Sequence, residues 1–227
     1  MAAIGIIGDF DPANETHLAT DDALRGHETT WVATDEVAGL DRFDGLFIAP
    51  GSPYRSLDGA LAAIEHARTG HVPLLGTCAG FQHLVIEFAR NVLGITGANH
   101  AEYDLEADDL FVTPLSCSLV GQELVVHVEP DSVAGRAYGA ALADGTVSER
   151  YYCNFGLASE REPALAAAGL VVSGRDADGE ARIVELPDHP FFVGTLFVPQ
   201  AASPDHPLVR SFLAAADARH EHAVHTL

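Results

Sequence analysis

Gly76-Thr77-Cys78-Ala79-Gly80 sets a cysteine between glycines at a junction of strand and helix. The apolar run at residues 72–75 predicts a buried parallel strand, and residues 81–93 carry apolar side chains at helical spacing. Small flanking residues permit the strained turn of a nucleophile elbow, which lifts a side chain above the sheet. The helix N-terminus beneath it favours a thiolate. The alternative is a buried structural cysteine in an ordinary turn.

Strands and helices alternate on both sides of this junction. The first half predicts strands at 3–8, 29–33, 45–49 and 72–76 and helices at 16–24, 57–68 and 81–93, with Thr16 as a candidate cap. This order predicts an α/β fold with a doubly wound, mostly parallel sheet of the flavodoxin-like type. The second half predicts partly antiparallel strands at 110–120, 123–128, 171–174 and 181–186, a strand at 191–197 and a helix at 208–218. No linker divides the chain, so we expect residues 1–227 to form a single domain.

The composition excludes several classes of protein. The formal net charge of −21 argues against a nucleic-acid surface, because binding phosphates needs clustered basic side chains. No apolar run reaches the roughly 18 residues of a membrane span, so no membrane partner is expected. Three cysteines, an odd number, do not make a disulfide framework, so we expect a cytoplasmic protein. No phosphate-binding G-x-x-x-x-G-K-[ST] motif occurs, and no cofactor or metal is expected.

Several separated segments match those of a known family in the same order. They are residues 73–82, 86–92, 99–103, 149–151 with Asn154, 185–193 and 206–208. On these segments the chain resembles the glutamine amidotransferase domain of CTP synthases, a class I (triad-type) amidotransferase, over nearly its whole length. The resemblance implies a cysteine that attacks the side-chain amide of glutamine, forms a γ-glutamyl thioester and releases ammonia.

The resemblance also implies roles for individual residues. Cys78 would be the nucleophile, and backbone N–H groups of Ala79 and of the Gly51-Ser52 turn would form the oxyanion hole. The remaining positions would bind glutamine or a related amino acid. They are Gln82 and Glu102 at its amino end, Arg150 at its α-carboxylate, and the adjacent Tyr151.

The chain departs from the family pattern at the last strand. The family's His-x-Glu pair, which activates the cysteine, is replaced by Val198 and Gln200. Loss of a general base typically costs about 10²–10⁴-fold in rate, and hydrolysis of the thioester should suffer most. A relocated base would be required. His100 is the first candidate, and the others are His83, His17, Asp9 and Asp11.

Other cysteines and histidines have simpler interpretations. Cys153 lies beside Arg150 in sequence and is either a redox partner of Cys78 or a passenger thiol. Cys117 is expected to be a core residue in a strand. The C-terminal histidines, His220, His222 and His225, are expected to be an incidental cluster in a frayed tail rather than a metal site.

Three functions follow from this sequence. The first is a cysteine-dependent amidotransferase or amidohydrolase acting on glutamine or a similar amino acid, with a relocated base. The second is a catalytically silent amino-acid-binding or regulatory protein that kept the pocket. The third is a paralogue that provides an interface to a synthase partner. Val198 and Gln200 favour the second, whereas Cys78 with its glutamine-binding residues favours the first.

Overall fold

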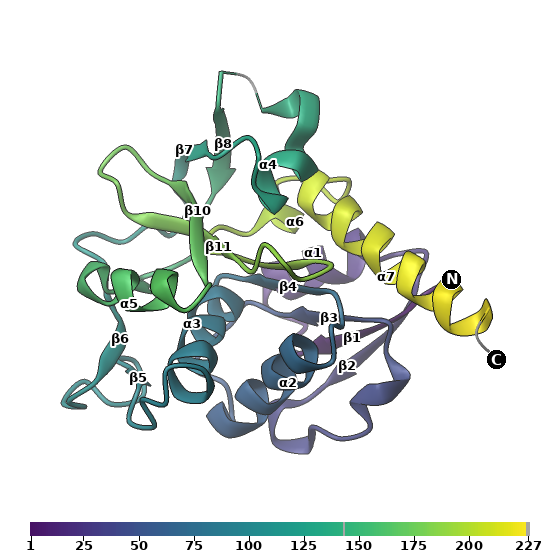
Figure 1. Ribbon diagram of the computed structural model, residues 1–227, viewed down its shortest axis with the longest axis horizontal. Helices are drawn as coiled ribbons and strands as arrows, with labels where there is room; N and C mark the ends of the chain where they lie inside the picture. Colours follow the sequence, from purple (N-terminus) through teal and green to yellow (C-terminus); the bar gives the residue numbers. More distant parts are fainter. Residues whose placement is uncertain (143, 226–227) are drawn as a thin grey trace.

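A nine-stranded sheet forms the centre of the computed structural model, which describes residues 1–142 and 144–225 (Figure 1). The strand order is β2-β1-β3-β4-β12-β11-β10-β7-β8, and a second sheet has the order β5-β6-β9. The strands are β1 (Ala3–Ile7), β2 (Glu28–Val32), β3 (Gly45–Ile48), β4 (Leu74–Thr77), β5 (Asn99–His100), β6 (Leu110–Pro114), β7 (Glu123–Val128), β8 (Thr146–Arg150), β9 (Phe155–Leu157), β10 (Val171–Arg175), β11 (Ala181–Glu185) and β12 (Phe192–Thr195).

The helices alternate with the strands mainly in the first half of the chain. They are α1 (Glu15–Ala23), α2 (Leu57–Thr69), α3 (Ala79–Asn91), α4 (Val133–Tyr138), α5 (Glu162–Ala167), α6 (Pro199–Ala202) and α7 (Pro207–His225). Strands β2, β1, β3, β4 and β12 pair in parallel, whereas β12, β11, β10, β7 and β8 pair antiparallel. This confirms the predicted α/β fold, with its parallel half and its antiparallel extension.

Both faces of the inner parallel strands β1, β3, β4 and β12 are buried, whereas the edge strand β2 is mostly exposed. On β3, the Phe47 ring packs against Phe212 of α7 with 6.1 Å between centroids. The next residue, Ile48, contacts the backbone of Gly80 at the start of α3. Because successive side chains of a strand point to opposite faces, α3 and α7 cover opposite sides of the sheet (Figure 1). This burial explains why residues 45–48 are apolar without alternation.

Five local predictions need correction. Asn14, not Thr16, caps α1, because the Asn14 side chain accepts the Thr16 N–H. The strand expected over 110–120 ends at Pro114, and Cys117 is exposed beyond it rather than buried. The closing helix continues to His225 instead of fraying after residue 218. Its His220 is held by Asp44 at 3.0 Å between Nδ1 and Oδ2, so it is not a loose tail residue.

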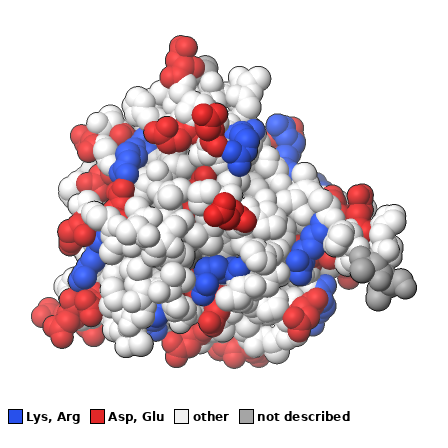
Figure 2. Space-filling view, in the orientation of Figure 1, with Lys and Arg blue, Asp and Glu red and all other residues white. Residues whose placement is uncertain are grey.

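The surface mixes acidic and basic side chains. Figure 2 shows Asp and Glu interspersed with Arg over one face of the molecule, with uncharged areas between them. Within residues 1–142 and 144–225, none of the helices combines the length and the apolar character needed to cross a bilayer.

Candidate functional site

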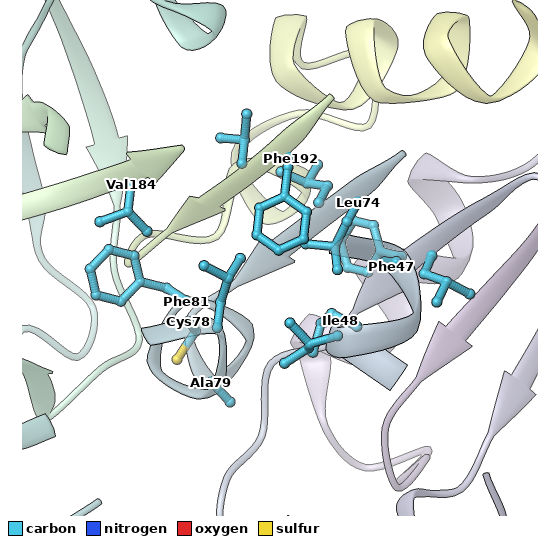
Figure 3. Close-up of a cluster of buried hydrophobic side chains, with 14 of the residues drawn as sticks. Phe47, Ile48, Leu74, Cys78, Ala79, Phe81, Val184 and Phe192 are labelled. Carbon is cyan, nitrogen blue, oxygen red and sulfur yellow. The ribbon is translucent and has the colours of Figure 1, made fainter. Parts of the chain in front are cut away.

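Cys78 occupies a strained elbow between β4 and α3. Its φ of 52° lies in the left-handed region, which costs energy for any residue with a Cβ atom. Figure 3 shows Cys78 and Ala79 at the start of α3, below the buried side chains of Phe47, Leu74 and Phe192. The Cys78 N–H donates to the carbonyl of Thr195 at 2.8 Å, which fixes the turn to β12.

The flanking glycines are required by close packing. A Cβ atom on Gly76 would lie 2.9 Å from the carbonyl carbon of Gly80, and one on Gly80 would lie 2.5 Å from the carbonyl oxygen of Ile48. Real Cβ atoms are essentially never found so close to backbone, so α3 reaches the sheet only because both positions lack a side chain. The sequence pattern of the elbow therefore has a direct steric explanation.

The elbow opens into a cavity of about 380 Å³ at the carboxyl ends of the parallel strands. Ligands of open α/β sheets bind at this edge. The lining comes from the segments after β1, β3, β4 and β8, together with Glu102: Ala13, Asn14, Glu15, Thr16, Pro50, Gly51, Ser52, Cys78, Gln82, Glu102, Tyr152, Cys153, Asn154 and Phe155.

The predicted oxyanion turn lines this cavity. Gly51 adopts a φ of 101°, so the residue of the turn that has a positive φ is a glycine. Ser52 is not among the described non-glycine residues with positive φ, so its backbone carries no strain of that kind. Ala79 is the first residue of α3, where backbone N–H groups lack partners within the helix.

Glu102 lines the cavity and carries an unused acceptor. Its Oε2 atom is buried and has no hydrogen-bond partner among the described residues. A buried carboxylate oxygen without a partner is costly, and a cationic ligand group would remove that cost. The Glu102 backbone is held in place, because its N–H donates to Nδ1 of His100 at 3.0 Å.

Gln82 is fixed by two hydrogen bonds of its side-chain amide. Its Nε2 donates to the carbonyl of Phe155 at 2.9 Å, and its Oε1 lies 3.1 Å from Nε2 of His100. Because Nδ1 of His100 already accepts the N–H of Glu102, Nε2 carries the proton and donates to Gln82. His100 therefore connects the two residues predicted to bind the amino end of the ligand.

His100 is poorly suited to the role of base that the sequence suggested. Both ring nitrogens are engaged, and the residue is completely buried and does not line the cavity. Burial, with a smaller contribution from His83, lowers its pKa to about 3. The ring stays neutral near pH 7, but no nitrogen lone pair is free to accept a proton from Cys78.

In His83 and His17, too, both ring nitrogens make hydrogen bonds within the protein. His83 donates from Nδ1 to the carbonyl of Ala79 at 2.7 Å, and its Nε2 meets the hydroxyl of Tyr103 at 2.8 Å. Burial lowers the pKa of His83 to about 4. His17 accepts the Asp11 N–H at 2.9 Å and lies 2.9 Å from the carbonyl of Pro50, so it supports the oxyanion turn.

The two aspartates after β1 accept hydrogen bonds from backbone N–H groups and so hold nearby loops in place. The Asp9 carboxylate accepts the N–H groups of Thr34 and Arg55, at 3.0 and 2.8 Å. Partial burial opposes ionisation of Asp9, but these donors outweigh it and lower the pKa. Asp11 accepts the N–H of Ala13 at 2.8 Å and closes the turn that leads into α1. Neither residue lines the cavity.

Arg150 and Tyr151 lie outside the cavity, and their neighbour lines it. Arg150 is exposed, with its guanidinium 5.5 Å from the ring centroid of Tyr152. Tyr151 is fully buried against Phe197. Tyr152 faces the cavity. Burial raises the pKa of Tyr152, and the nearby Glu15 carboxylate adds a smaller contribution in the same direction. Sequence reasoning missed Tyr152 and Glu15, although both flank segments that it had singled out.

Val198 and Gln200, after β12, are packed as neutral groups. Val198 is fully buried, and its N–H donates to the carbonyl of Arg150 at 2.9 Å. The Gln200 amide donates to the hydroxyl oxygens of Thr20 and Thr77, at 3.0 and 3.1 Å. The Gln200 Oε1 atom is buried with no partner among the described residues. The end of β12 thus presents no titratable side chain at these positions.

Cys153 is the second sulfur at the site. The structure pairs it with Cys78 as a disulfide, and the two Cα atoms are 6.1 Å apart. Both cysteines line the cavity. No group of three or more His, Cys, Asp or Glu side chains in the described part of the chain could hold a metal ion.

Comparison with known proteins agrees with this geometry. The family model of class-I glutamine amidotransferases matches residues 18–203. The chain belongs to this family. It is 35% identical to the CTP synthase of Thermobifida fusca over 94% of this chain and 44% of that protein. It is 32% identical to the CTP synthase of Archaeoglobus fulgidus over 98% of this chain and 46% of that protein. The chain thus spans less than half the length of these relatives.

Solved structures extend the similarity to three dimensions. The glutaminase domain of Trypanosoma brucei CTPS with bound acivicin superposes with a TM-score of 0.85 at 25% identity, over 96% of this chain and 94% of that one. A glutamine amidotransferase of Thermotoga maritima has a TM-score of 0.57 at 11% identity, over 97% of this chain and 84% of that one, and shares the fold. The protein is therefore a class-I glutamine amidotransferase domain related to the glutaminase domain of CTP synthases.

Proposed function

We propose that residues 1–227 act as one glutamine-binding domain in which Cys78 attacks the side-chain amide of glutamine or a similar amino acid. The observation that carries this proposal is the elbow itself. Its strained backbone holds the cysteine at a cavity that is also lined by Glu102, whose buried Oε2 has no partner among the described residues. Strain at one residue is kept where the surrounding structure enforces it, and such residues cluster at functional sites.

The acylation step does not require a side-chain base once Cys78 is a thiolate. The Cys78 thiolate forms a bond to the amide carbon, the nitrogen takes a proton from solvent water and the C–N bond breaks, so that ammonia leaves and a thioester remains. The backbone N–H groups of Ala79 and of the Gly51-Ser52 turn would stabilise the oxyanion. Glu102 would bind the α-ammonium group, and Tyr152, which lines the cavity where Arg150 does not, would help to shape the ligand site.

Hydrolysis of the thioester is proposed to be slow. Val198 and Gln200 stand where the family has its base and the carboxylate that orients it, so the triad is incomplete. None of the three histidines near the site has a free ring nitrogen. We therefore assign His100 a positioning role, through Gln82 and Glu102. Water then attacks the thioester without a paired base, and deacylation limits turnover.

A second candidate is a catalytically silent amino-acid-binding subunit. The neutral packing of Val198 and Gln200 favours it, because this corner of the site is satisfied without any charged group. In either case a synthase partner that accepts ammonia, or that responds to bound glutamine, is proposed from the relatives. The CTP synthases are more than twice as long as the matched region.

The test is labelling of the reduced protein by acivicin, the compound bound in the T. brucei structure, followed by intact mass and peptide mapping. We expect one adduct on Cys78, suppressed by excess glutamine and absent in Cys78→Ala. Cys117→Ser is the matched control, because Cys117 is exposed and lies outside this cavity. Labelling only at Cys117, or labelling of Cys78 that glutamine does not suppress, would overturn the enzyme proposal.

A second measurement separates the two candidates. Radiolabelled glutamine is incubated with the reduced protein, which is then denatured in acid and treated with hydroxylamine, a reagent that cleaves thioesters. Hydroxylamine-sensitive label on Cys78, with little free ammonia after the first equivalent, supports slow deacylation. Calorimetric binding of glutamine to wild type without any covalent label supports the silent subunit. Absence of both label and binding contradicts both candidates.

A further inference from the structure

The pair of sulfur atoms at the site carries an inference that does not rest on the proposed function. Cys78 and Cys153 are 75 residues apart in sequence, and their Cα atoms are 6.1 Å apart. Disulfides span Cα separations of about 4.4–6.8 Å, so the backbone already has the spacing that a bond needs. We propose that Cys153 is the resolving cysteine of a peroxide-sensitive switch that closes Cys78 in an intramolecular disulfide.

The backbone on both sides of Cys153 is held in register. The carbonyl of Cys153 accepts the Leu119 N–H at 3.1 Å, and the carbonyl of Asn154 accepts the Leu115 N–H at 2.9 Å. The Tyr151 N–H donates to the carbonyl of Gln122 at 2.9 Å. These bonds tie the segment after β8 to the loop after β6, so Cys153 is placed opposite the elbow by backbone contacts.

The reduced form of Cys153 also has a defined place. Its sulfur lies 3.0 Å from the carbonyl oxygen of Leu196, to which the thiol donates when it is not in the disulfide. The residue is 1% exposed, against 7% for Cys78. Cys78 also stands at the N-terminus of α3, which favours the thiolate, so it is the cysteine that an oxidant reaches and reacts with first.

The chemistry balances with hydrogen peroxide as the oxidant. The Cys78 thiolate attacks one peroxide oxygen; the S–O bond forms, the O–O bond breaks and, with one proton, water leaves. The resulting sulfenic acid is attacked by the Cys153 thiolate; the S–S bond forms, the S–O bond breaks, and the leaving hydroxide takes the proton that the Cys153 thiol gave up and departs as water. Two thiols and one peroxide thus give one disulfide and two waters. A dithiol reverses the bond by exchange.

The disulfide would reversibly inactivate Cys78 and at the same time protect its sulfur from further oxidation. In the disulfide, Cys78 has no thiolate and cannot acylate, and it cannot proceed to the irreversible sulfinic acid. In a reducing cytoplasm such a bond would be transient, as expected of a redox sensor rather than a structural staple.

The test uses the full chain, reduced and freed of reductant, then treated with a small molar excess of hydrogen peroxide. Non-reducing intact mass should show the loss of two hydrogens, and peptide mapping should join the peptides that contain Cys78 and Cys153. Dithiothreitol should restore the starting mass. None of these readouts needs glutamine, so failure of the switch and failure of the proposed function are distinguishable.

Three variants make the result specific. In Cys153→Val, and in Cys153→Ser as a second variant should the first not fold, peroxide should leave Cys78 as a sulfenic acid that dimedone traps. In the matched control Cys117→Ser, the disulfide should form as in wild type. The proposal is overturned if folded wild type gains oxygen atoms at Cys78 as readily as Cys153→Val, or if its only disulfides are intermolecular bonds through Cys117.

Discussion

The elbow between β4 and α3 and the turn between β12 and α6 lie on neighbouring, parallel-paired strands of one sheet. The elbow has a cysteine with a left-handed backbone conformation and two glycines whose close packing leaves no room for a side chain. It opens into a cavity. The turn after β12 has a buried valine and a glutamine that bonds to two threonine hydroxyls. The comparison shows that a strained, cavity-lining cysteine and a strand end packed with neutral groups can stand side by side on one sheet. Under the proposed function, the groups that bind ligand would then be separable from the groups that move protons.

The largest expected effect comes from placing a titratable pair at positions 198 and 200. We expect Val198→His with Gln200→Glu to raise glutamine hydrolysis by about 10²–10⁴-fold, because a base would then assist attack of water on the thioester. Ammonia release is the measurement, with circular dichroism to check folding. The matched control is Val198→Gln with Gln200→Glu, which has similar bulk but no imidazole. Equal rates in the two double variants would show that the absent base is not what limits turnover.

A smaller effect is expected from filling the space beneath the elbow. Gly80→Ala places a methyl group 2.5 Å from the carbonyl oxygen of Ile48, so α3 must shift. We expect a loss of about 3 kcal/mol in the free energy of unfolding, at the upper end for overpacking. Urea denaturation measures it. Gly97→Ala is the control, because its Cβ would meet its nearest neighbour at an ordinary 3.4 Å. Equal stabilities would contradict the steric account of the elbow.

The smallest of the three effects concerns the buried histidines behind the cavity. Burial lowers the pKa of His100 from 6.5 to about 3, so the unfolded chain binds a proton that the folded chain does not. The stability from neutral His100 is therefore present above about pH 6.5 and is lost as the pH falls toward 3. Between pH 7 and 5 the loss should be on the order of 2 kcal/mol for this residue.

His100→Asn tests this expectation. Asparagine keeps an acceptor for the Glu102 N–H but does not titrate, so the drop in unfolding free energy between pH 7 and 5 should shrink by that amount. The exposed His127, on β7, provides the control variant His127→Asn. A pH dependence that is the same in His100→Asn as in wild type would mean that His100 is not held neutral by burial.

Much of the fold could be predicted from the sequence, because apolar runs and glycine positions reflect local constraints. The strands at 45–48 and 74–77 were identified from continuous apolar residues, and the elbow from its glycines. The strand at 110–114 was extended too far, and β8 and β9 were missed, because short edge segments have weak periodicity. The C-terminal helix was cut short because its last turns are polar and are stabilised by contacts such as His220 with Asp44.

The candidate site was predicted less completely. Cys78, Gln82, Glu102 and the Gly51-Ser52 turn line one cavity, whereas Ala79, Arg150 and Tyr151 do not. Segment resemblance places a residue on the correct loop but cannot say which of two neighbours faces inward. This is why Tyr152 was missed beside Tyr151. The candidate bases could not be assessed either, because the hydrogen bonds of a histidine ring come from residues distant in sequence.

The sequence by itself determined the family, the parallel sheet and the position of Cys78, because those depend on apolar periodicity and on glycines beside a turn. The tertiary structure decided that His17, His83 and His100 have no free nitrogen, that Tyr152 faces the cavity, and that Cys153 lies against Cys78. The physical reason is that backbone conformation is governed by neighbours in the chain, whereas proton transfer and sulfur chemistry depend on distances of a few ångströms between segments that only folding brings together.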